Sequence, residues 1–335
     1  MQHLTTRKPI INYIIILTTL IFSSLIIDQG NDPALARYSS TCEKIGWFPS
    51  DFGLKDHHVF IYDGYYYLIS IYVPLGTADP LLQDRFAYAR SLDLCNWEDL
   101  TPVLPDRMSG SWDESAIWAP YVYQENGIYY LYYTGVTRDF TQSILLATST
   151  DPSNPESWIE QEMVFQPNHP GMIWQDGKAA DCRDPTVIKQ GDVYYMYYAG
   201  QDESGSIIGL ATAPSPMGPW TDWGTVVSPE PDAILESPTI AQFEGFSYLF
   251  FTRSTVGGFY RIGADQSGPW RAPVSFNPGW AHEIWQDMGG KWFTSFLTNL
   301  TVTIEPLSWD KLFYPPRPFI GSTIVHTFIP LLTKP

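Results

Sequence analysis

Hydrophobic and polar positions alternate in short runs along most of the chain, and one arrangement of these runs occurs five times. Each copy is a short extended run, a turn with glycine and then a run rich in aromatic residues. Alternation with a period of two predicts β-strands, and a glycine between two such runs suits a tight turn. The turn glycines are Gly64, Gly127, Gly191, Gly245 and Gly290, at spacings of 63, 64, 54 and 45 residues.

The first four copies each lead into a second shared piece, which is a strand, a polar turn and a tryptophan. These tryptophans are Trp97, Trp158, Trp220 and Trp270. A period of about 45 to 65 residues with several short strands per unit is typical of a β-propeller. We therefore predict an all-β fold, a five-bladed β-propeller with few helices. The tyrosine stripes and the four tryptophans are expected to pack between blades.

Composition agrees with a folded β-protein and narrows the choice of partners. Aromatic residues make up 16% of the 335 residues and charged residues another 16%, which is too apolar for a disordered chain. The formal net charge of −17 repels phosphate backbones, so we expect no nucleic-acid partner. No composition shift marks a second domain. We expect residues 37–335 to form one propeller domain, in which 311–335 close or brace the ring; the oligomeric state stays open.

Residues 1–36 have the pattern of a targeting segment. Arg7 and Lys8 precede an apolar run over residues 10–27, and Ala34-Leu35-Ala36 offers a small-x-small cleavage site. The apolar run is also long enough for an uncleaved membrane anchor. We predict a signal peptide or an anchor here, a secreted, periplasmic or cell-surface location, and no other membrane contact.

Two further patterns concern covalent chemistry. The three cysteines, Cys42, Cys95 and Cys182, permit at most one disulfide within the chain, and their spacing resembles no metal motif. Asn299-Leu300-Thr301 is a glycosylation sequon, which matters only in a host that glycosylates.

The repeat also predicts where chemistry gathers. The innermost strand of every propeller blade runs the same way along the central axis, so the starts of the five strands converge on one opening. The position seven to nine residues before each turn glycine holds three carboxylates and one imidazole. In blade order this position is filled by Asp56, Ala119, Asp184, Glu236 and His282.

Carboxylates crowded around a concave site raise one another's pKa, which leaves one group protonated and another ionised. Cleavage of a glycosidic bond needs such a pair, because the leaving oxygen must be protonated while a water or a carboxylate attacks the opposite face. The pattern therefore favours a glycosidase over a binding or structural protein.

These segments resemble the five-bladed β-propeller glycoside hydrolases, most of all family 43, to which families 32 and 68 are related. The resemblance covers about residues 50 to 300 and is carried by "KDHHVFIYDGYYYL", "WAPYVYQENGIYYLYY", "RDPTV", "ESPTI" and "HEIWQDMGGKWF". It implies that Asp56 is the base, that Glu236 is the general acid, and that Asp184 binds substrate and keeps the pKa of Glu236 raised. His57 stands where family 43 usually has proline after the catalytic aspartate.

The same resemblance suggests residues that contact the sugar, namely His57, His58, Trp118, Arg183, Arg253 and His282. It places His282 near a metal ion, implies no required cofactor and allows a structural calcium ion in the central channel. The expected partner is a carbohydrate substrate, with arabinose or xylose units favoured. Two alternatives stay open: a fructan-type, family 32-like retaining hydrolase or transferase, and a propeller that binds carbohydrate without catalysis.

Overall fold

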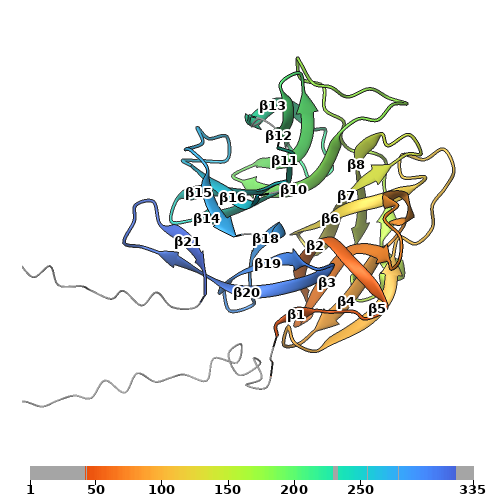
Figure 1. The fold of residues 1–335 in the computed structure, drawn as a ribbon, viewed down its shortest axis with the longest axis horizontal. Coiled ribbons are helices and arrows are strands. Elements are labelled where there is room, and N and C mark those ends of the chain that lie inside the picture. Colours follow the sequence, from red (N-terminus) through yellow and green to blue (C-terminus); the bar gives the residue numbers. More distant parts are fainter. Residues whose placement is uncertain (1–41, 43, 229–232, 255, 278, 322–335) are drawn as a thin grey trace, which may run out of the picture.

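The computed structural model describes residue 42 and residues 44–228, 233–254, 256–277 and 279–321. Over these ranges the chain folds into five antiparallel sheets arranged around a central axis (Figure 1). The helices there are two short 3₁₀ turns, η2 (Pro80–Leu82) and η3 (Pro155–Ser157). The all-β, five-bladed prediction is confirmed. The predicted signal peptide or anchor lies outside the described residues, and no helix in the described part is long and apolar enough to cross a membrane.

Four blades each consist of four strands that follow one another along the chain, and the fifth blade combines strands from both ends. Blade one holds β2 (Phe52–Tyr62), β3 (Tyr65–Pro74), β4 (Phe86–Ser91) and β5 (Trp97–Val103). Blade two holds β6 (Ala116–Glu125), β7 (Ile128–Val136), β8 (Gln142–Ser149) and β9 (Ile159–Glu160). Blade three holds β10 (Cys182–Gln190), β11 (Val193–Asp202), β12 (Gly205–Ala213) and β13 (Thr221–Val227). Blade four holds β14 (Leu235–Phe243), β15 (Phe246–Arg253), β16 (Gly257–Gly263) and β17 (Val274–Asn277). Blade five holds β18 (Trp280–Gln286), β19 (Trp292–Thr298), β20 (Thr301–Asp310), β1 (Gly46–Trp47) and β21 (Arg317–Ile320).

The predicted turn glycines all lie between the first two strands of a blade. Their φ angles run from 61° to 79°, a conformation in which glycine carries no steric cost. The turns themselves differ in length and in the place of the glycine. In blade three, Gly191 is the first residue after the inner strand, whereas in blade four Gly245 is the second. In blade five, five residues separate β18 from β19.

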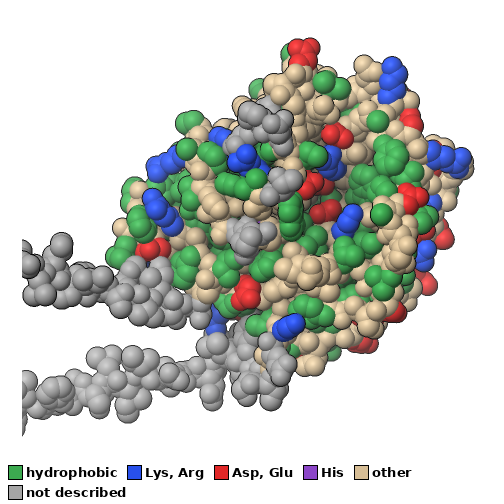
Figure 2. All heavy atoms as spheres, in the orientation of Figure 1, with side chains coloured by type: hydrophobic (Ala, Val, Ile, Leu, Met, Phe, Trp, Pro, Cys, Tyr) green, Lys and Arg blue, Asp and Glu red, His purple; other side chains and the backbone are tan. Residues whose placement is uncertain are grey.

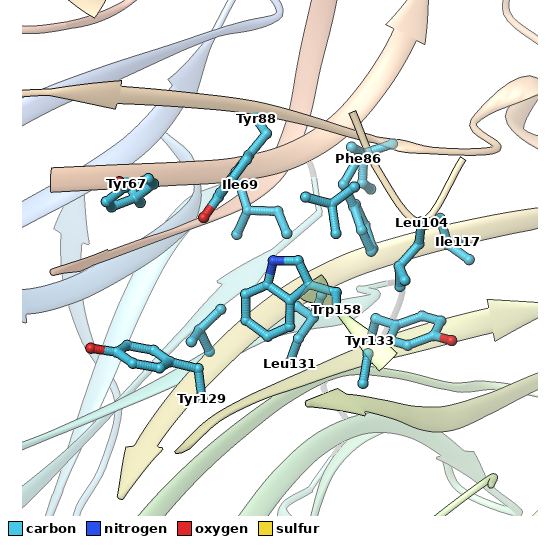
Figure 3. Packing of buried hydrophobic residues seen from close by; sticks show 14 of the residues in the cluster. Tyr67, Ile69, Phe86, Tyr88, Leu104, Ile117, Tyr129, Leu131, Tyr133 and Trp158 are labelled. Atoms are coloured by element: carbon cyan, nitrogen blue, oxygen red, sulfur yellow. The ribbon is translucent and has the colours of Figure 1, made fainter. Parts of the chain in front are cut away.

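The aromatic stripes fill the space between neighbouring blades, as the sequence predicts. Figure 3 shows this packing between blades one and two, where Tyr67, Tyr88, Tyr133 and Trp158 meet among leucine and isoleucine side chains. All four side chains are buried. Burial of this many large rings is the main force that holds the blades together.

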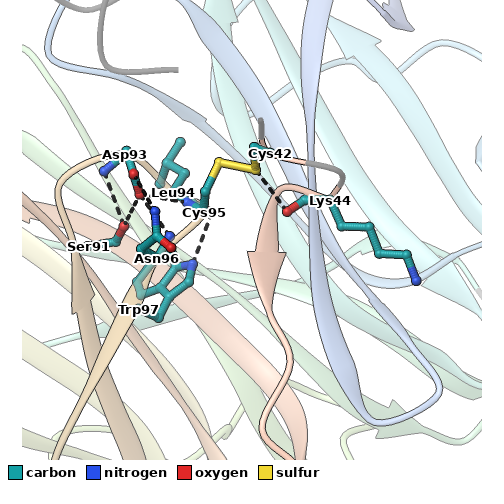
Figure 4. The surroundings of a disulfide bond; sticks show 8 residues. All are labelled: Cys42, Lys44, Ser91, Asp93, Leu94, Cys95, Asn96 and Trp97. Carbon is teal, nitrogen blue, oxygen red and sulfur yellow. Dashed lines mark hydrogen bonds between the residues drawn. A yellow bond between two sulfur atoms is a disulfide. The ribbon is translucent and has the colours of Figure 1, made fainter. Parts of the chain in front are cut away.

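The N-terminal lead-in closes the ring. Strand β1 pairs with β20 in blade five, and β21 pairs with the other half of β20, so both ends of the described chain brace that blade. A disulfide between Cys42 and Cys95 ties the lead-in to blade one (Figure 4). The side chain of Trp47 donates a hydrogen bond to Asp99 of blade one at 2.9 Å. Cys182 is the buried cysteine left over, so the expected limit of one disulfide holds.

The inner strands share one irregularity that positions the site. In each of β2, β6, β10, β14 and β18 the pairing with the second strand shifts near the strand start, which marks a β-bulge. Four bulges contain a residue with φ between 46° and 57°, namely Ala119, Asp184, Ser237 and Ala281. A left-handed residue in a strand redirects the neighbouring side chains, so the bulges decide which of them face the central opening.

Candidate active site

The bulge register corrects the sequence alignment of the five inner strands. Asp184 in blade three is equivalent to Ser237 in blade four and to Ala281 in blade five, since each is the left-handed bulge residue. Glu236 therefore lies one position earlier than predicted, at the place of Arg183 in blade three. His282 lies one position later. The prediction was wrong in register because the turn glycine has no fixed place within its turn.

The three predicted catalytic carboxylates nevertheless meet at the mouth of the channel. Asp56 and Glu236 line the same cavity of about 310 Å³. Asp56 also lines a second cavity of about 20 Å³, deeper in the channel, together with Asp184 and Glu283. That volume is enough for about one water molecule. Asp56 thus stands between Glu236, whose side chain is 33% exposed, and Asp184, whose side chain is 7% exposed.

Arg183 links two of these carboxylates. Its guanidinium nitrogens lie 3.9 Å from Asp184 Oδ2 and 4.0 Å from Glu236 Oε2. A third contact, to Asp181 Oδ1 at 3.3 Å, holds the guanidinium from the other side. Arg183 was predicted to contact substrate. The structure places it at the mouth, where it is an electrostatic partner of the acids.

Asp184 has a second task, which is to hold the bulge of the next blade. In blade three the backbone N–H of the bulge residue Asp184 donates a hydrogen bond to Thr134 Oγ1 at 3.2 Å. In blade five the N–H of Ala281 donates one to Thr252 Oγ1 at 3.1 Å. Blade three has Ala199 at the position of these threonines. The bulge N–H of Ser237 is donated instead to Asp184 Oδ2, at 2.8 Å.

Burial raises the pKa of all three carboxyl groups, and repulsion by a neighbouring carboxylate adds to each rise. The pKa of Asp56 rises from 3.8 to about 8, chiefly through burial and then through repulsion by Asp184 and Glu236. Burial also raises the pKa of Glu236, with repulsion by Asp184 added, and burial raises that of Asp184. Lys55 and Arg183 oppose these shifts but do not cancel them. Three acids beside two cations therefore keep protons at pH values where a solvated carboxyl has lost its own.

Two of the predicted histidines, His57 and His58, lie where blade one meets blade five. His57 Nε2 forms a hydrogen bond with Ser295 Oγ at 2.8 Å, and His58 Nδ1 forms one with Glu283 Oε2 at 3.3 Å. Both contacts join blade one to blade five. His57 also lines the deeper cavity, and burial lowers its pKa to about 3. Their role as sugar contacts stays a prediction.

His282 is 1% exposed and packs between two phenylalanine rings, with ring centroids 5.4 Å from Phe276 and 5.5 Å from Phe296. Burial lowers its pKa to about 4, so the imidazole is neutral around pH 7. Across the described ranges, no three His, Cys, Asp or Glu side chains lie close enough together to hold a metal ion. Calcium prefers six to eight oxygen ligands. Backbone carbonyl groups and water can supply such ligands, so the structural calcium ion in the central channel and the metal ion near His282 stay predictions.

The two remaining predicted contacts lie away from the cavity of Asp56 and Glu236. Trp118 is half-buried against the core between blades one and two, and its Nε1 donates to Pro80 O at 3.3 Å. Arg253 ends β15, and its guanidinium carbon lies 5.2 Å from the centre of the Phe259 ring.

Seven residues of the cavity wall were missed by the sequence predictions, and those with polar or aromatic side chains are Lys55, Trp280 and Asn299. Trp280 precedes the blade-five motif, and Asn299 lies in the turn between β19 and β20, so neither belongs to a repeated segment. Lys55 and Trp280 stand directly before their bulges, the position that Glu236 fills in blade four. This equivalence could not be read from the sequence, because the bulges were not identifiable there. On the face shown in Figure 2, acidic and basic side chains lie among hydrophobic ones around the middle of the ring.

Comparison with known proteins agrees with this geometry. Residues 53–181 match the model of glycosyl hydrolases family 43. A probable arabinan endo-1,5-alpha-L-arabinosidase C of Aspergillus flavus is 25% identical over 165 residues, which is 49% of this chain and 50% of that protein. A bifunctional 6(G)-fructosyltransferase/2,1-fructan:2,1-fructan 1-fructosyltransferase of Allium cepa is 33% identical over 138 residues, 38% of this chain and 21% of that protein. The chain thus spans about half the length of the first relative and about a fifth of the second.

A solved structure shares the whole ring. The alpha-L-arabinanase of Cellvibrio cellulosa, complexed with arabinohexaose, superposes with a TM-score of 0.62 at 16% identity, covering 81% of this chain and 96% of that one. At this identity the likeness establishes the fold alone. Residues 53–181, which hold the first two blades, are thus similar to glycoside hydrolase family 43, and the five-bladed propeller is the fold that the chain shares with the arabinanase.

Proposed function

We propose that this chain is an exported glycoside hydrolase that cleaves arabinose- or xylose-type glycosidic bonds in plant or microbial oligo- and polysaccharides. The observation that carries the proposal is the single cavity shared by Asp56 and Glu236, two carboxyl groups with raised pKa on opposite sides of blade five. The names of the Aspergillus relative and of the Cellvibrio arabinanase support the choice of sugar. The basic, apolar N-terminus supports export.

In the proposed reaction, Asp56 accepts a proton from a water molecule as the water oxygen attacks the anomeric carbon. The bond from that carbon to the leaving oxygen breaks, and Glu236 donates its proton to this oxygen. Attack on the face opposite the leaving group inverts the anomeric configuration. Asp184 raises the pKa of both groups and binds substrate, and Arg183 limits how far the pKa of Glu236 rises.

The reactive state has one proton on Glu236 and none on Asp56. Because the pKa of Asp56 is raised to about 8, this state becomes populated as the pH approaches 8, and the acid limb of activity should lie in that range. Because all three pKa values are raised and the groups repel one another, protons leave the cluster in coupled steps that belong to the group as a whole. We expect a bell-shaped dependence of kcat/KM on pH. The acid limb reports loss of the ionised base, and the alkaline limb reports loss of the proton from the acid.

The test measures hydrolysis of arabinan, xylan and their short oligosaccharides by the wild type and by Asp56→Asn and Glu236→Gln. Each variant should lose about 10²- to 10⁴-fold in kcat, the usual contribution of a general acid or base. Glu203→Gln, an exposed acid in the turn after β11, serves as the matched control and should keep full activity. Turnover by either active-site variant at the wild-type rate would contradict the assignment.

Leaving-group chemistry separates the two roles. The phenol of an activated aryl glycoside is acidic enough to leave as a phenolate, without a proton from the enzyme. Glu236→Gln should therefore cleave such a glycoside far better than an oligosaccharide. Asp56→Asn should be impaired on both substrates. Proton NMR of the first product formed should show inversion. Sugar binding without any turnover by the wild type would favour a carbohydrate-binding propeller instead.

A second candidate is a fructan-active enzyme, which the similarity to the onion fructosyltransferase specifically favours. In that mechanism Asp56 acts as the nucleophile and forms a covalent intermediate, and the anomeric configuration is retained. Cleavage of sucrose or inulin with retention, and no cleavage of arabinan, would select this candidate.

A further inference from the structure

The five residues that stand directly before the bulges occupy a ring of equivalent positions near the starts of the inner strands. In blade order they are Lys55, Trp118, Arg183, Glu236 and Trp280. Lys55, Glu236 and Trp280 line the same cavity, and Arg183 contacts Glu236. Within this ring Trp280 is the aromatic side chain beside the two proposed catalytic carboxyl groups, because blade five lies between blade four and blade one.

The exposure of Trp280 is unusual for its place. Trp280 begins an inner strand and is 39% exposed, whereas the other aromatic residues of the five inner strands, over their described lengths, are buried or partly buried. Trp280 lines a cavity whose apolar wall includes Leu54, Leu297 and Leu300. An exposed aromatic face in a concave site with a few polar groups is the common composition of a small-molecule site.

The polar groups of the cavity are both donors and acceptors. Lys55 donates, Asn299 can donate and accept, and the carboxylates accept when ionised. This combination fits a neutral ring with hydroxyl groups at its edge and C–H bonds on its face. An anion would be repelled by the carboxylates. An alkyl chain would bury the polar groups of the cavity without giving them hydrogen-bond partners.

The hairpin turn between β19 and β20, which carries Asn299, is fixed against blade one. Asn299 and Leu300 form the two-residue turn between β19 and β20, with φ angles of 52° and 60° that match a hairpin turn. The carbonyl oxygen of Leu300 accepts a hydrogen bond from the N–H of Leu54 at 2.7 Å. A Cβ added at Gly53 would lie 3.0 Å from Leu300 Cβ, so the hairpin tip and blade one are already in close contact. The backbone of Asn299 is thereby held in place before any ligand binds.

We propose that Trp280 and Asn299 form a sugar subsite on the blade-five wall, in which the indole face stacks on one sugar ring and the amide contacts its hydroxyl groups. The subsite rests on the proposed function, since it orients the sugar at the bond that Asp56 and Glu236 act on. Trp280 and Asn299 are positioning residues here, and they set the affinity for that sugar unit more than the chemical step.

The test compares Trp280→Ala and Trp280→Phe with a matched control, Trp223→Ala. Trp223 is 67% exposed and lies on β13, the outermost strand of blade three. We expect Trp280→Ala to raise KM at least about tenfold with a smaller change in kcat, Trp280→Phe to recover most of the loss, and Trp223→Ala to match the wild type. Asn299→Ala should raise KM about three- to tenfold. A fall in kcat alone, or an equal loss in Trp223→Ala, would overturn the proposal.

Binding measured without turnover separates this proposal from the proposed function. Arabinotriose and xylotriose are titrated by calorimetry into Glu236→Gln and into Glu236→Gln/Trp280→Ala, with thermal unfolding as the check that both variants are folded. If the wild type hydrolyses nothing but the added Trp280→Ala weakens binding at least about tenfold, the proposed function fails and the subsite stands. Equal binding by both variants, or no binding of any sugar by either, overturns the subsite.

Discussion

Replacing Asp56 by asparagine should make the folded protein more stable while abolishing its activity, and the gain should grow with pH. Asparagine has nearly the shape of a protonated aspartate but cannot ionise. Burial together with repulsion by Asp184 and Glu236 raises the pKa of Asp56 from 3.8 to about 8. Below pH 3.8 the carboxyl group is protonated in both the folded and the unfolded chain, so it favours neither. As the pH rises towards 8, the unfolded chain releases the proton while the folded chain keeps it, and stability falls.

The magnitude follows from that pKa. One pKa unit corresponds to about 1.4 kcal/mol, so the rise from 3.8 to about 8 sets an upper bound of about 6 kcal/mol above pH 8. At pH 7 the bound is about 4 kcal/mol. Part of the rise comes from Asp184 and Glu236, which adjust their own protonation, and we therefore expect about half of the bound, about 2 kcal/mol at pH 7. At about 2–4 °C per kcal/mol, the melting temperature should rise by about 4–8 °C.

The assay is denaturant unfolding followed by tryptophan fluorescence at pH 4.5, 6 and 7.5. The free energy of unfolding of Asp56→Asn minus that of the wild type should be small at pH 4.5 and should increase at each step. Asp63→Asn, an exposed aspartate in the turn after β2, is the control and should show no trend. His57 and His282, whose pKa values burial lowers to about 3 and about 4, destabilise both proteins below pH 6.5 and cancel in the difference. A difference that is flat with pH would refute the reasoning.

Three further predictions concern the pH dependence of activity, the disulfide that closes the ring and the hairpin turn at Asn299. Asp184→Asn removes a charge that raises the pKa of Asp56 and Glu236, so both limbs of kcat/KM should move to lower pH, whereas Arg183→Met should move both to higher pH. A shift in the same direction in the two variants would contradict the electrostatic assignment. Replacing Cys42 and Cys95 by serine releases a link across 53 residues and should lower the free energy of unfolding by about 2–4 kcal/mol, measured by denaturant titration, with activity intact at low temperature. Production in a glycosylating host should attach a glycan to Asn299 and lower kcat/KM on polysaccharides, whereas the same protein from a host that does not glycosylate should keep the higher value.

Features that recur along the chain were predictable, because repetition turns a weak local signal into a strong one. A single run such as the one ending at Gly64 could belong to many β-proteins. Five such runs at spacings of 45 to 64 residues fit a propeller with five blades. The tyrosine stripes were predictable for the same reason, since every blade presents the same two faces to its neighbours.

The register of the site could not be predicted, because it depends on bulges and turn lengths that leave no local trace. Counting back from Gly245 places Glu236 in the same row as Asp184, and the structure moves it one residue earlier. A shift of one residue in a strand reverses the side chain, and only the bulge brings both acids to the mouth. The hairpin tip at Asn299 was missed for a related reason. Its place in the site depends on how blade five meets blade one, which is a contact between residues far apart in the sequence.

The bulges also explain how one repeated strand can supply different chemical groups at different depths. Each inner strand presents two successive residues to the channel, one directly before the bulge and one within it. Glu236 and Trp280 come from the first row and lie at the rim, where a leaving sugar must depart. Asp56 and Asp184 come from the second row and lie deeper, where burial raises their pKa. An enzyme that needs an accessible acid and a sheltered base can therefore obtain both from one architecture, by choosing which of the two rows carries the carboxylate in each blade.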